Sequence, residues 1–190
     1  SVRAASLDDL KIIRELAAHS KVIAIGEIGL DYYWDKTTAE LQQKLFEQQL
    51  ELAAELNLPV AIHDRDAHRA VLDTLAEVGA PEKVVFHCYS GDVEMARECI
   101  ENGYYLSFAG TVTFKNAPHL REALAITPLD KILVETDAPF LTPTPNRGLL
   151  NTPAQIPHTL RLMAEVRQMP LDELCEAIVA NTLRVYGEFN

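Results

Sequence analysis

The chain has 190 residues, 28 of them acidic and 17 basic, and its net charge is −11. This negative charge argues against a broad electrostatic surface for nucleic acid, so a phosphate-bearing substrate has to be held locally, by a few arginines or by bound cations. No window approaches the roughly 18–20 apolar residues of a membrane span, and no signal peptide opens the chain. The chain has three cysteines and no CxxC pair, which predicts reduced thiols in a cytoplasmic protein.

Short apolar, β-branched segments alternate with segments of helical periodicity along the whole chain. In order, we expect a helix near 7–19, a strand at 22–30, a helix at 38–57, a strand at 59–63, a helix at 66–78, a strand at 83–90, a helix at 92–101, a strand at 104–110, a helix at 118–125, a strand at 131–137, and helices at 157–168 and 171–186. The helix at 38–57 has the clearest apolar stripe, marked by Leu41, Leu45, Leu52 and Leu56.

This order of elements is typical of an α/β protein with a parallel sheet whose strands are buried on both faces. Periodicity leaves two arrangements open, a doubly wound open sheet and a (β/α)8 barrel. No GxGxxG motif follows a strand, so a dinucleotide site is not indicated. Five strands are too few to close an eight-stranded barrel, which typically takes about 250 residues.

The polar residues of the expected strands lie at their C-terminal ends. In chain order these residues are Glu27 with Asp31 just beyond it, then His63 and Arg65, then His87, then Ser107, and finally Glu135 and Asp137. The C-terminal ends of parallel strands meet on one face, where the active site of such folds lies. Two imidazoles and two or more carboxylates would therefore converge, and these groups are ligands of Zn²⁺, Mn²⁺ or Mg²⁺.

Each of these residues also has a structural interpretation. A single histidine at a strand end is more often structural than a ligand, Glu27 could cap the following helix, and Asp137 could accept N–H groups of a proline-rich turn. The convergence of four such residues on one face favours the metal site. For Tyr32, Tyr33 and Trp34, just after the first strand, core packing is the expected role and a base-stacking platform the alternative.

Five motifs, in order, resemble the TatD family of metal-dependent deoxyribonucleases. They are GEIGLDYY (26–33), IHDRDA (62–67), FHCYSG (86–91), SFAG (107–110) and ETDAPFLTP (135–143); RG…N at 147–151 and Asn181 in ANTLRVYG also match. The resemblance implies a (β/α)8 TIM barrel of the amidohydrolase-like kind, with residues 1–190 forming a single metal-dependent hydrolase domain. It also implies one or two bound divalent ions, Mg²⁺, Mn²⁺ or Zn²⁺.

The resemblance assigns roles to individual residues. Glu27 is similar to the family's bridging carboxylate ligand, His63 and His87 to the two histidines of one metal, and Asp137 to the aspartate that binds the other metal and handles the nucleophilic water. Glu135 is expected one layer deeper, supporting a ligand histidine. The implied activity is a DNase of 3′–5′ exonuclease type, which hydrolyses phosphodiester bonds at single-stranded DNA ends with a metal-activated water.

Two arginines are candidates for holding the substrate phosphate. Arg65 lies on the same side of its strand as His63, because alternate residues of a strand share a face. Its guanidinium could hold a phosphate oxygen bidentately. Arg147 is the second candidate.

The sequence departs from the family pattern in two places. No H-x-H pair occurs anywhere, and GEIG, which normally follows three earlier strands, comes soon after Ser1. We therefore expect an N-terminal truncation, with the five strands corresponding to the last five of eight. The late loop reads RGLLNTP where the family usually has a stretch close to R-G-K-R-N-E-P, which predicts a weaker phosphate grip or a different substrate.

These departures keep two alternatives open. One is a metal-dependent deacylase or amidohydrolase acting on a small or aminoacyl substrate, and the other is an inactive fragment that lacks part of the metal site. The sequence does not indicate the oligomeric state.

Overall fold

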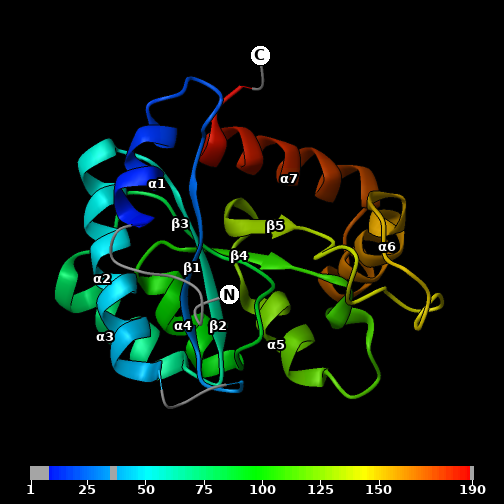
Figure 1. Cartoon of the computed structure of the whole chain (residues 1–190). Helices are drawn as coiled ribbons and strands as arrows, with labels where there is room; N and C mark the ends of the chain where they lie inside the picture. The colour runs from blue at the N-terminus through cyan, green and yellow to red at the C-terminus, as the bar shows by residue number, and fades with distance from the viewer. Residues whose placement is uncertain (1–8, 35–37, 189–190) are drawn as a thin grey trace. The chain divides into compact units, whose positions relative to one another are not determined.

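The computed structural model describes residues 9–34 and 38–188 of the chain, which Figure 1 colours from blue to red. The strands are β1 (Ile25–Asp31), β2 (Val60–Arg65), β3 (Val84–Phe86), β4 (Tyr105–Phe108) and β5 (Ile132–Val134). The α-helices are α1 (Asp9–Ala17), α2 (Ala39–Leu56), α3 (His68–Val78), α4 (Val93–Glu101), α5 (Pro118–Ile126), α6 (Ile156–Arg167) and α7 (Leu171–Tyr186). The described residues also contain the short 3-10 helices η3 (Gly110–Thr113), η4 (Leu129–Lys131) and η5 (Pro153–Gln155).

The α/β class and the order of elements expected from the sequence are confirmed. Along the sheet the strands follow their order in the chain, β1-β2-β3-β4-β5. Strands β3, β4 and β5 end earlier than expected, at Phe86, Phe108 and Val134, whereas β1 and β2 run slightly further, to Asp31 and Arg65. His87, Glu135 and Asp137 therefore lie just beyond their strands. That the five strands are the last five of an eight-stranded barrel stays a prediction.

The chain divides into two compact units at the boundary between Val85 and Phe86. The first unit contains α1 to α3 with β1 and β2, and the second contains α4 to α7 with β4 and β5. The expectation of a single hydrolase domain over residues 1–190 stays a prediction.

In the first unit, β1 and β2 pair in parallel and approach each other closely. The register runs from Ile25 opposite Val60 to Asp31 opposite Arg65, and it shifts between Gly26 and Ile28. Glu27 is thus an extra residue in β1, and such a bulge turns the side chain it carries. Gly29 has a φ of +137°, and a Cβ there would lie 2.0 Å from the carbonyl oxygen of His63. A glycine is therefore required where β1 passes the site.

Helix α2 covers this strand pair with a face that differs from the expected stripe. Its buried residues are Gln42, Leu45, Phe46, Leu50, Leu52 and Ala53. Leu41, expected in the stripe, is 38% exposed, because the buried face of the helix is centred about one residue further along. The sequence pattern missed the buried amide of Gln42, since glutamine is mostly a surface residue.

The second unit contains the parallel pair β4–β5, with Leu106 opposite Ile132 and Phe108 opposite Val134. Two polar side chains link helices of this unit to neighbouring segments through hydrogen bonds to backbone carbonyl groups. Asn181 of α7 is 1% exposed and donates to the carbonyl oxygens of Leu129 and Ile132, at 2.8 Å each. The guanidinium of Arg167 at the end of α6 donates to three carbonyl oxygens at the C-terminal end of α5.

None of the described helices is long and apolar enough to cross a membrane. The three cysteines, all within the described residues, form no disulfide.

Candidate metal centre

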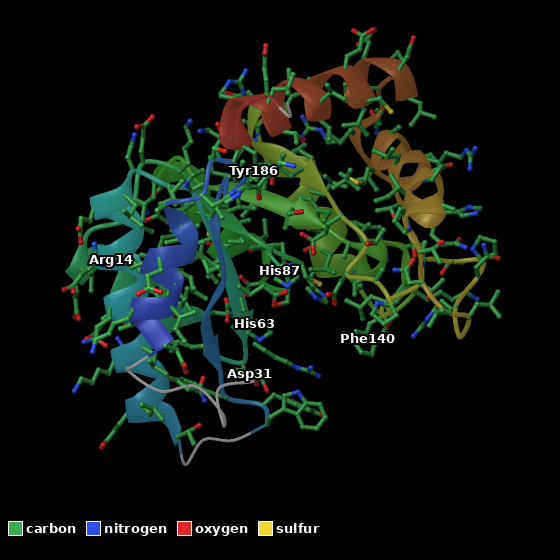
Figure 2. The ribbon with its side chains drawn as sticks, turned by 45° about the horizontal axis from the view of Figure 1, so that its top comes forward. Arg14, Asp31, His63, His87, Phe140 and Tyr186 are labelled. Atoms are coloured by element: carbon green, nitrogen blue, oxygen red, sulfur yellow. The ribbon has the colours of Figure 1, made fainter. Side chains whose placement is uncertain are left out.

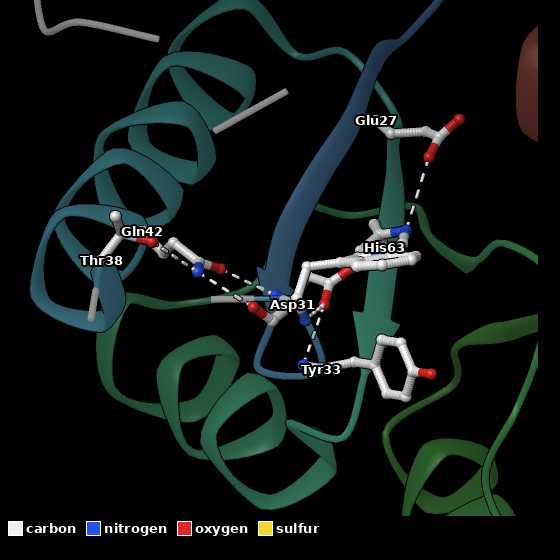
Figure 3. A network of polar contacts seen from close by, with 7 residues as sticks. Glu27, Asp31, Tyr33, Thr38, Gln42 and His63 are labelled. Carbon is white, nitrogen blue, oxygen red and sulfur yellow. Dashed lines mark hydrogen bonds and ion pairs between the residues drawn. The ribbon is translucent and has the colours of Figure 1, made fainter. Parts of the chain in front are cut away.

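His63, in the middle of β2, stands between two carboxylates of β1 (Figure 3). Its Nδ1 atom lies 3.5 Å from Oε2 of Glu27, and its Nε2 atom lies 3.1 Å from Oδ2 of Asp31. The side chain of His63 is 34% exposed, that of Glu27 54% and that of Asp31 17%. The two flanks of the imidazole ring thus face different chemical partners, a sheltered carboxylate and an open one.

The contact with Asp31 determines which ring nitrogen of His63 can bind a metal ion. A carboxylate only accepts hydrogen bonds, so Nε2 carries the proton toward Asp31, and the lone pair of the neutral ring lies on Nδ1. Nδ1 and the Glu27 oxygen are then two acceptors that face each other at 3.5 Å. Two acceptors in this position need a proton or a cation between them. Two ligands of a tetrahedral ion with bonds of about 2.0–2.2 Å are about 3.4 Å apart, so this pair fits a metal ion.

Asp31 is held in place by the buried amide of Gln42 (Figure 3). The amide oxygen of Gln42 accepts the backbone N–H of Asp31 at 2.8 Å, and its Nε2 donates to the backbone carbonyl of Asp31 at 3.0 Å. A second bond from Nε2 reaches the hydroxyl of Thr38 at 3.1 Å. Because helix α2 fixes the backbone of Asp31, it also fixes the carboxylate that orients His63.

The loop after β1 presents an aromatic pair next to Arg65. Tyr33 is 56% exposed and Trp34 is 69% exposed, which corrects the expectation that these rings pack in the core. Their rings meet edge to face at 5.0 Å. The guanidinium carbon of Arg65 lies 4.0 Å from the centre of the Tyr33 ring and 5.5 Å from that of Trp34. The arginine stacks on the rings and so holds them at the surface instead of in the core.

In the second unit, His87 lies directly after β3 and is backed by Glu135. Its Nδ1 atom is 2.7 Å from Oε1 of Glu135, and the two side chains are 15% and 21% exposed. The hydroxyl of Ser107, which is 3% exposed, donates to the other oxygen, Oε2, at 2.6 Å. Oε1 is buried, and its 2.7 Å contact is with Nδ1 of the His87 ring.

This arrangement resembles that of His63 and Asp31. A carboxylate lies beside one ring nitrogen, Nδ1, and leaves the lone pair on Nε2 as the potential metal ligand. Glu135 also acts on Tyr186 at the end of α7. The pKa of the Tyr186 phenol is raised, mainly by burial and in addition by the negative charge of Glu135. The negative charge of Glu135 therefore acts both on the His87 ring and on the Tyr186 phenol in the last turn of α7.

Asp137 lies in a tight turn directly after β5. Its φ is +56°, in the left-handed region that aspartate tolerates better than most residues. Its backbone carbonyl accepts the N–H of Phe140 at 2.9 Å. The buried side chain of Asn151 donates to the carbonyl oxygens of Thr136 and Phe140, at 2.8 and 2.6 Å. The amide thus closes the turn that carries Asp137.

Arg147, the second phosphate candidate, lies in the same loop region. Its guanidinium carbon is 3.8 Å from the centre of the Phe114 ring. The neighbouring side chains Leu149 and Leu150 are 64% and 73% exposed. The loop therefore offers one stacked arginine and two exposed apolar side chains.

The structure brings together Glu27, Asp31 and His63 in the first unit, and Ser107, His87 and Glu135 in the second. Sequence reasoning placed Ser107 on the active face without a role of its own, and it assigned no site role to Asp31 or Gln42. For Asp31 a signal was present, because it is the last residue of β1, the strand that carries Glu27. Gln42 gave none, since a helical glutamine is ordinarily on the surface.

An α/β fold in which two histidines, His63 and His87, each lie beside a carboxylate is typical of metal-binding proteins. The sequence profile of the family "TatD related DNase" matches residues 1–187. The chain is 46% identical over 181 residues to an uncharacterized metal-dependent hydrolase, YabD, of Bacillus subtilis (strain 168), covering 94% of this chain and 71% of that protein. It is 42% identical over 180 residues to an uncharacterized metal-dependent hydrolase named TatD of Mycobacterium tuberculosis, covering 92% of this chain and 68% of that protein.

Similarity to a solved structure supports the same family. The crystal structure of YJJV, a TatD homolog from Escherichia coli K12, superposes with a TM-score of 0.93 at 32% identity, covering 99% of this chain and 73% of that one. This chain belongs to the TatD family of metal-dependent hydrolases.

Proposed function

We propose that this chain is a DNase that releases nucleotides from single-stranded DNA ends, in the 3′–5′ direction, by metal-dependent hydrolysis of phosphodiester bonds. The observation that carries the proposal is the facing pair of acceptors, Nδ1 of His63 and Oε2 of Glu27, at 3.5 Å. This pair suits a divalent cation, and membership of a family named for a DNase supports the choice of substrate.

His87 is proposed as the third ligand, with Glu27 and His63. Its Nε2 lone pair is left available by the contact of Nδ1 with Glu135. A set of two imidazoles and one carboxylate is a common donor set for Zn²⁺ and Mn²⁺, and Mg²⁺ would rely more on the carboxylates. Bound there, one or two divalent ions would offset the charge of the phosphate and lower the pKa of a water molecule.

The other residues of the chain have proposed roles of their own. Asp137, in its closed turn, would bind the second ion and accept the proton of the attacking water. Arg65 and Arg147 hold phosphate oxygens, for which the planar guanidinium has well-placed N–H donors. Because the chain carries a net charge of −11, these local contacts have to overcome a general repulsion of DNA.

Two further parts of the proposal follow from the family. The five strands are proposed to belong to a barrel of the (β/α)8 type, which the TM-score of 0.93 to the YJJV structure supports. A cytoplasmic location is proposed because the three cysteines form no disulfide, as expected in a reducing compartment.

The test is the release of nucleotides from a 5′-labelled single-stranded oligonucleotide with Mg²⁺ or Mn²⁺, and with EDTA as the blank. The wild-type chain is compared with Asp137→Asn and with Asp130→Asn, which makes the same change at an exposed aspartate. We expect a ladder of progressively shorter labelled products that needs metal, persists in Asp130→Asn and is lost in Asp137→Asn. Equal product with EDTA, or an unchanged rate in Asp137→Asn, would contradict the proposal.

The alternative substrate class is an ester or amide, such as an aminoacyl bond. It is favoured by Leu149 and Leu150, which are 64% and 73% exposed where the family pattern is basic. The same three proteins are given acylated amino acid and aminoacyl ester substrates. Metal-dependent hydrolysis of these substrates without DNA cleavage, lost in Asp137→Asn, would replace the DNase assignment by a deacylase.

A further inference from the structure

The exposed aromatic pair beside His63 forms, with Arg65, a compact surface cluster that has no part in metal binding. We call Tyr33, Trp34 and Arg65 the stacking cluster. Two large aromatic rings at 56% and 69% exposure cost free energy in water unless they contact something. Arg65 covers one face of the Tyr33 ring, at 4.0 Å, and lies further from the Trp34 ring, at 5.5 Å. Trp34 thus remains the most exposed aromatic side chain of the cluster.

The cluster is fixed to the metal-binding histidine through Asp31. Oδ1 of Asp31 accepts the backbone N–H groups of Tyr33 and Trp34, at 3.0 and 3.2 Å, while Oδ2 contacts His63 at 3.1 Å (Figure 3). Figure 2 shows Asp31 beside His63 with the side chains drawn. One carboxylate therefore positions both the potential ligand and the aromatic backbone, so whatever binds the rings is held at a fixed place relative to His63.

The chemistry of the cluster matches one nucleotide of a single strand. An exposed indole offers a flat face on which any unpaired base can stack, whatever the base. A guanidinium that stacks with its face on a tyrosine keeps its N–H groups at its edge, where they can donate to a phosphate oxygen. Stacking is also a means of binding that the net charge of −11 does not oppose.

We propose that the stacking cluster binds one unpaired nucleotide of single-stranded DNA, with its base on Trp34 and its phosphate on the edge of Arg65. This inference deepens the proposed DNase function and rests on it for the choice of DNA. It adds what that function leaves open, namely how an acidic protein retains a single strand and why it selects unpaired ends. A base inside a duplex is stacked on both faces and offers neither to Trp34.

Trp34 is the only tryptophan of the chain, so its fluorescence reports on the cluster alone. We would titrate the chain in EDTA with an eight-nucleotide oligo(dT), and with an abasic strand that carries the same number of phosphates. The oligo(dT) is expected to quench the fluorescence to saturation, whereas the abasic strand is expected to bind about tenfold more weakly, which corresponds to the loss of one stacked base.

Variants separate the ring from the charge, with binding measured by the anisotropy of labelled oligo(dT). Trp34→Ala should weaken binding about tenfold, while Trp34→Phe should retain most of it. Arg65→Gln should reduce the slope of log affinity against log salt by about 0.7, the value for one phosphate contact on a single strand. Leu16→Ala, which removes a side chain that is 62% exposed on α1, is the matched control and should bind like the wild type.

The results overturn the proposal if oligo(dT) causes no quench, if the abasic strand binds equally well, or if Trp34→Ala binds like the wild type. A quench by anionic phospholipid vesicles but not by oligo(dT) would assign the cluster to a membrane surface and also overturn it. Since these measurements are made in EDTA, they are independent of cleavage. If the strand stacks on Trp34 but is never hydrolysed, the nucleotide-binding proposal stands and the DNase proposal is wrong. If DNA is hydrolysed but does not stack on Trp34, the DNase proposal stands and the nucleotide-binding proposal is wrong.

Discussion

Replacing Gln42 by leucine should destabilise the first unit and at the same time loosen His63, the proposed metal ligand. Gln42 is 3% exposed, and its amide satisfies both the backbone N–H and the backbone carbonyl of Asp31. A leucine of similar size fills the space but makes neither bond. Each partly buried backbone group that loses its partner costs about 1–3 kcal/mol.

The two groups together predict a loss of about 2–4 kcal/mol in the free energy of unfolding, since the apolar side chain recovers part of the cost. For a chain of this size, a loss of 1 kcal/mol lowers the Tm by about 2–4 °C. We therefore expect the Tm of Gln42→Leu, followed by circular dichroism, to fall by about 5–12 °C. The affinity for Mn²⁺ should fall as well, because Asp31 no longer holds His63 in one orientation.

The matched control is Gln49→Leu, the same change on the same helix at a partly exposed position. It should shift the Tm by less than about 2 °C, as surface substitutions usually do. If Gln42→Leu and Gln49→Leu melt together, or if Gln42→Leu melts like the wild type, the bonds to Asp31 do not contribute as the structure indicates.

Three other substitutions test the neighbouring contacts. Gly29→Ala places a Cβ 2.0 Å from a carbonyl oxygen of β2 and should abolish or severely weaken folding, whereas Gly79→Ala, with a similar positive φ but nothing within 4 Å, should cost only about 1 kcal/mol; equal melting temperatures would contradict the close approach. Asn151→Ala breaks two bonds to carbonyl oxygens around the turn after β5 and should cost about 2–3 kcal/mol; a urea midpoint equal to that of the wild type would contradict this. Ser107→Ala leaves Oε2 of Glu135 without its 2.6 Å hydrogen bond and should weaken Mn²⁺ binding about tenfold; an unchanged dissociation constant would show that this bond does not act on the metal site.

The alternation of segments was sufficient to predict the α/β class and the place of each α-helix and strand that the structure describes, but not the 3-10 helices. The reason is that buried strands and amphipathic helices have different hydrophobic periods, and turn residues such as Asn102 and Gly79 end the helices where expected. The expectation that polar residues lie at strand ends is met only in part: His87, Glu135 and Asp137 lie just beyond β3 and β5, whereas Glu27 and His63 lie inside β1 and β2.

The contacts within the site could not be predicted in the same way. The bulge at Glu27 depends on the register of β1 against β2, which no local pattern records. The amide of Gln42 and the stacking of Arg65 on Tyr33 depend on side chains that come from different elements. Aromatic residues after a strand are usually packed inside, and here a neighbouring arginine from β2 holds them at the surface instead.

The central claim is that Glu27, His63 and His87 hold a divalent cation, and calorimetric titration with Mn²⁺ tests it most directly. We expect one weakly bound ion per chain, with at least a tenfold loss of affinity in Glu27→Gln, in His63→Ala and in His87→Ala, and no loss in His119→Ala, which changes a histidine of α5. Binding of two tight ions per chain, or equal Mn²⁺ affinity in the wild type and in the three ligand variants, would contradict the account.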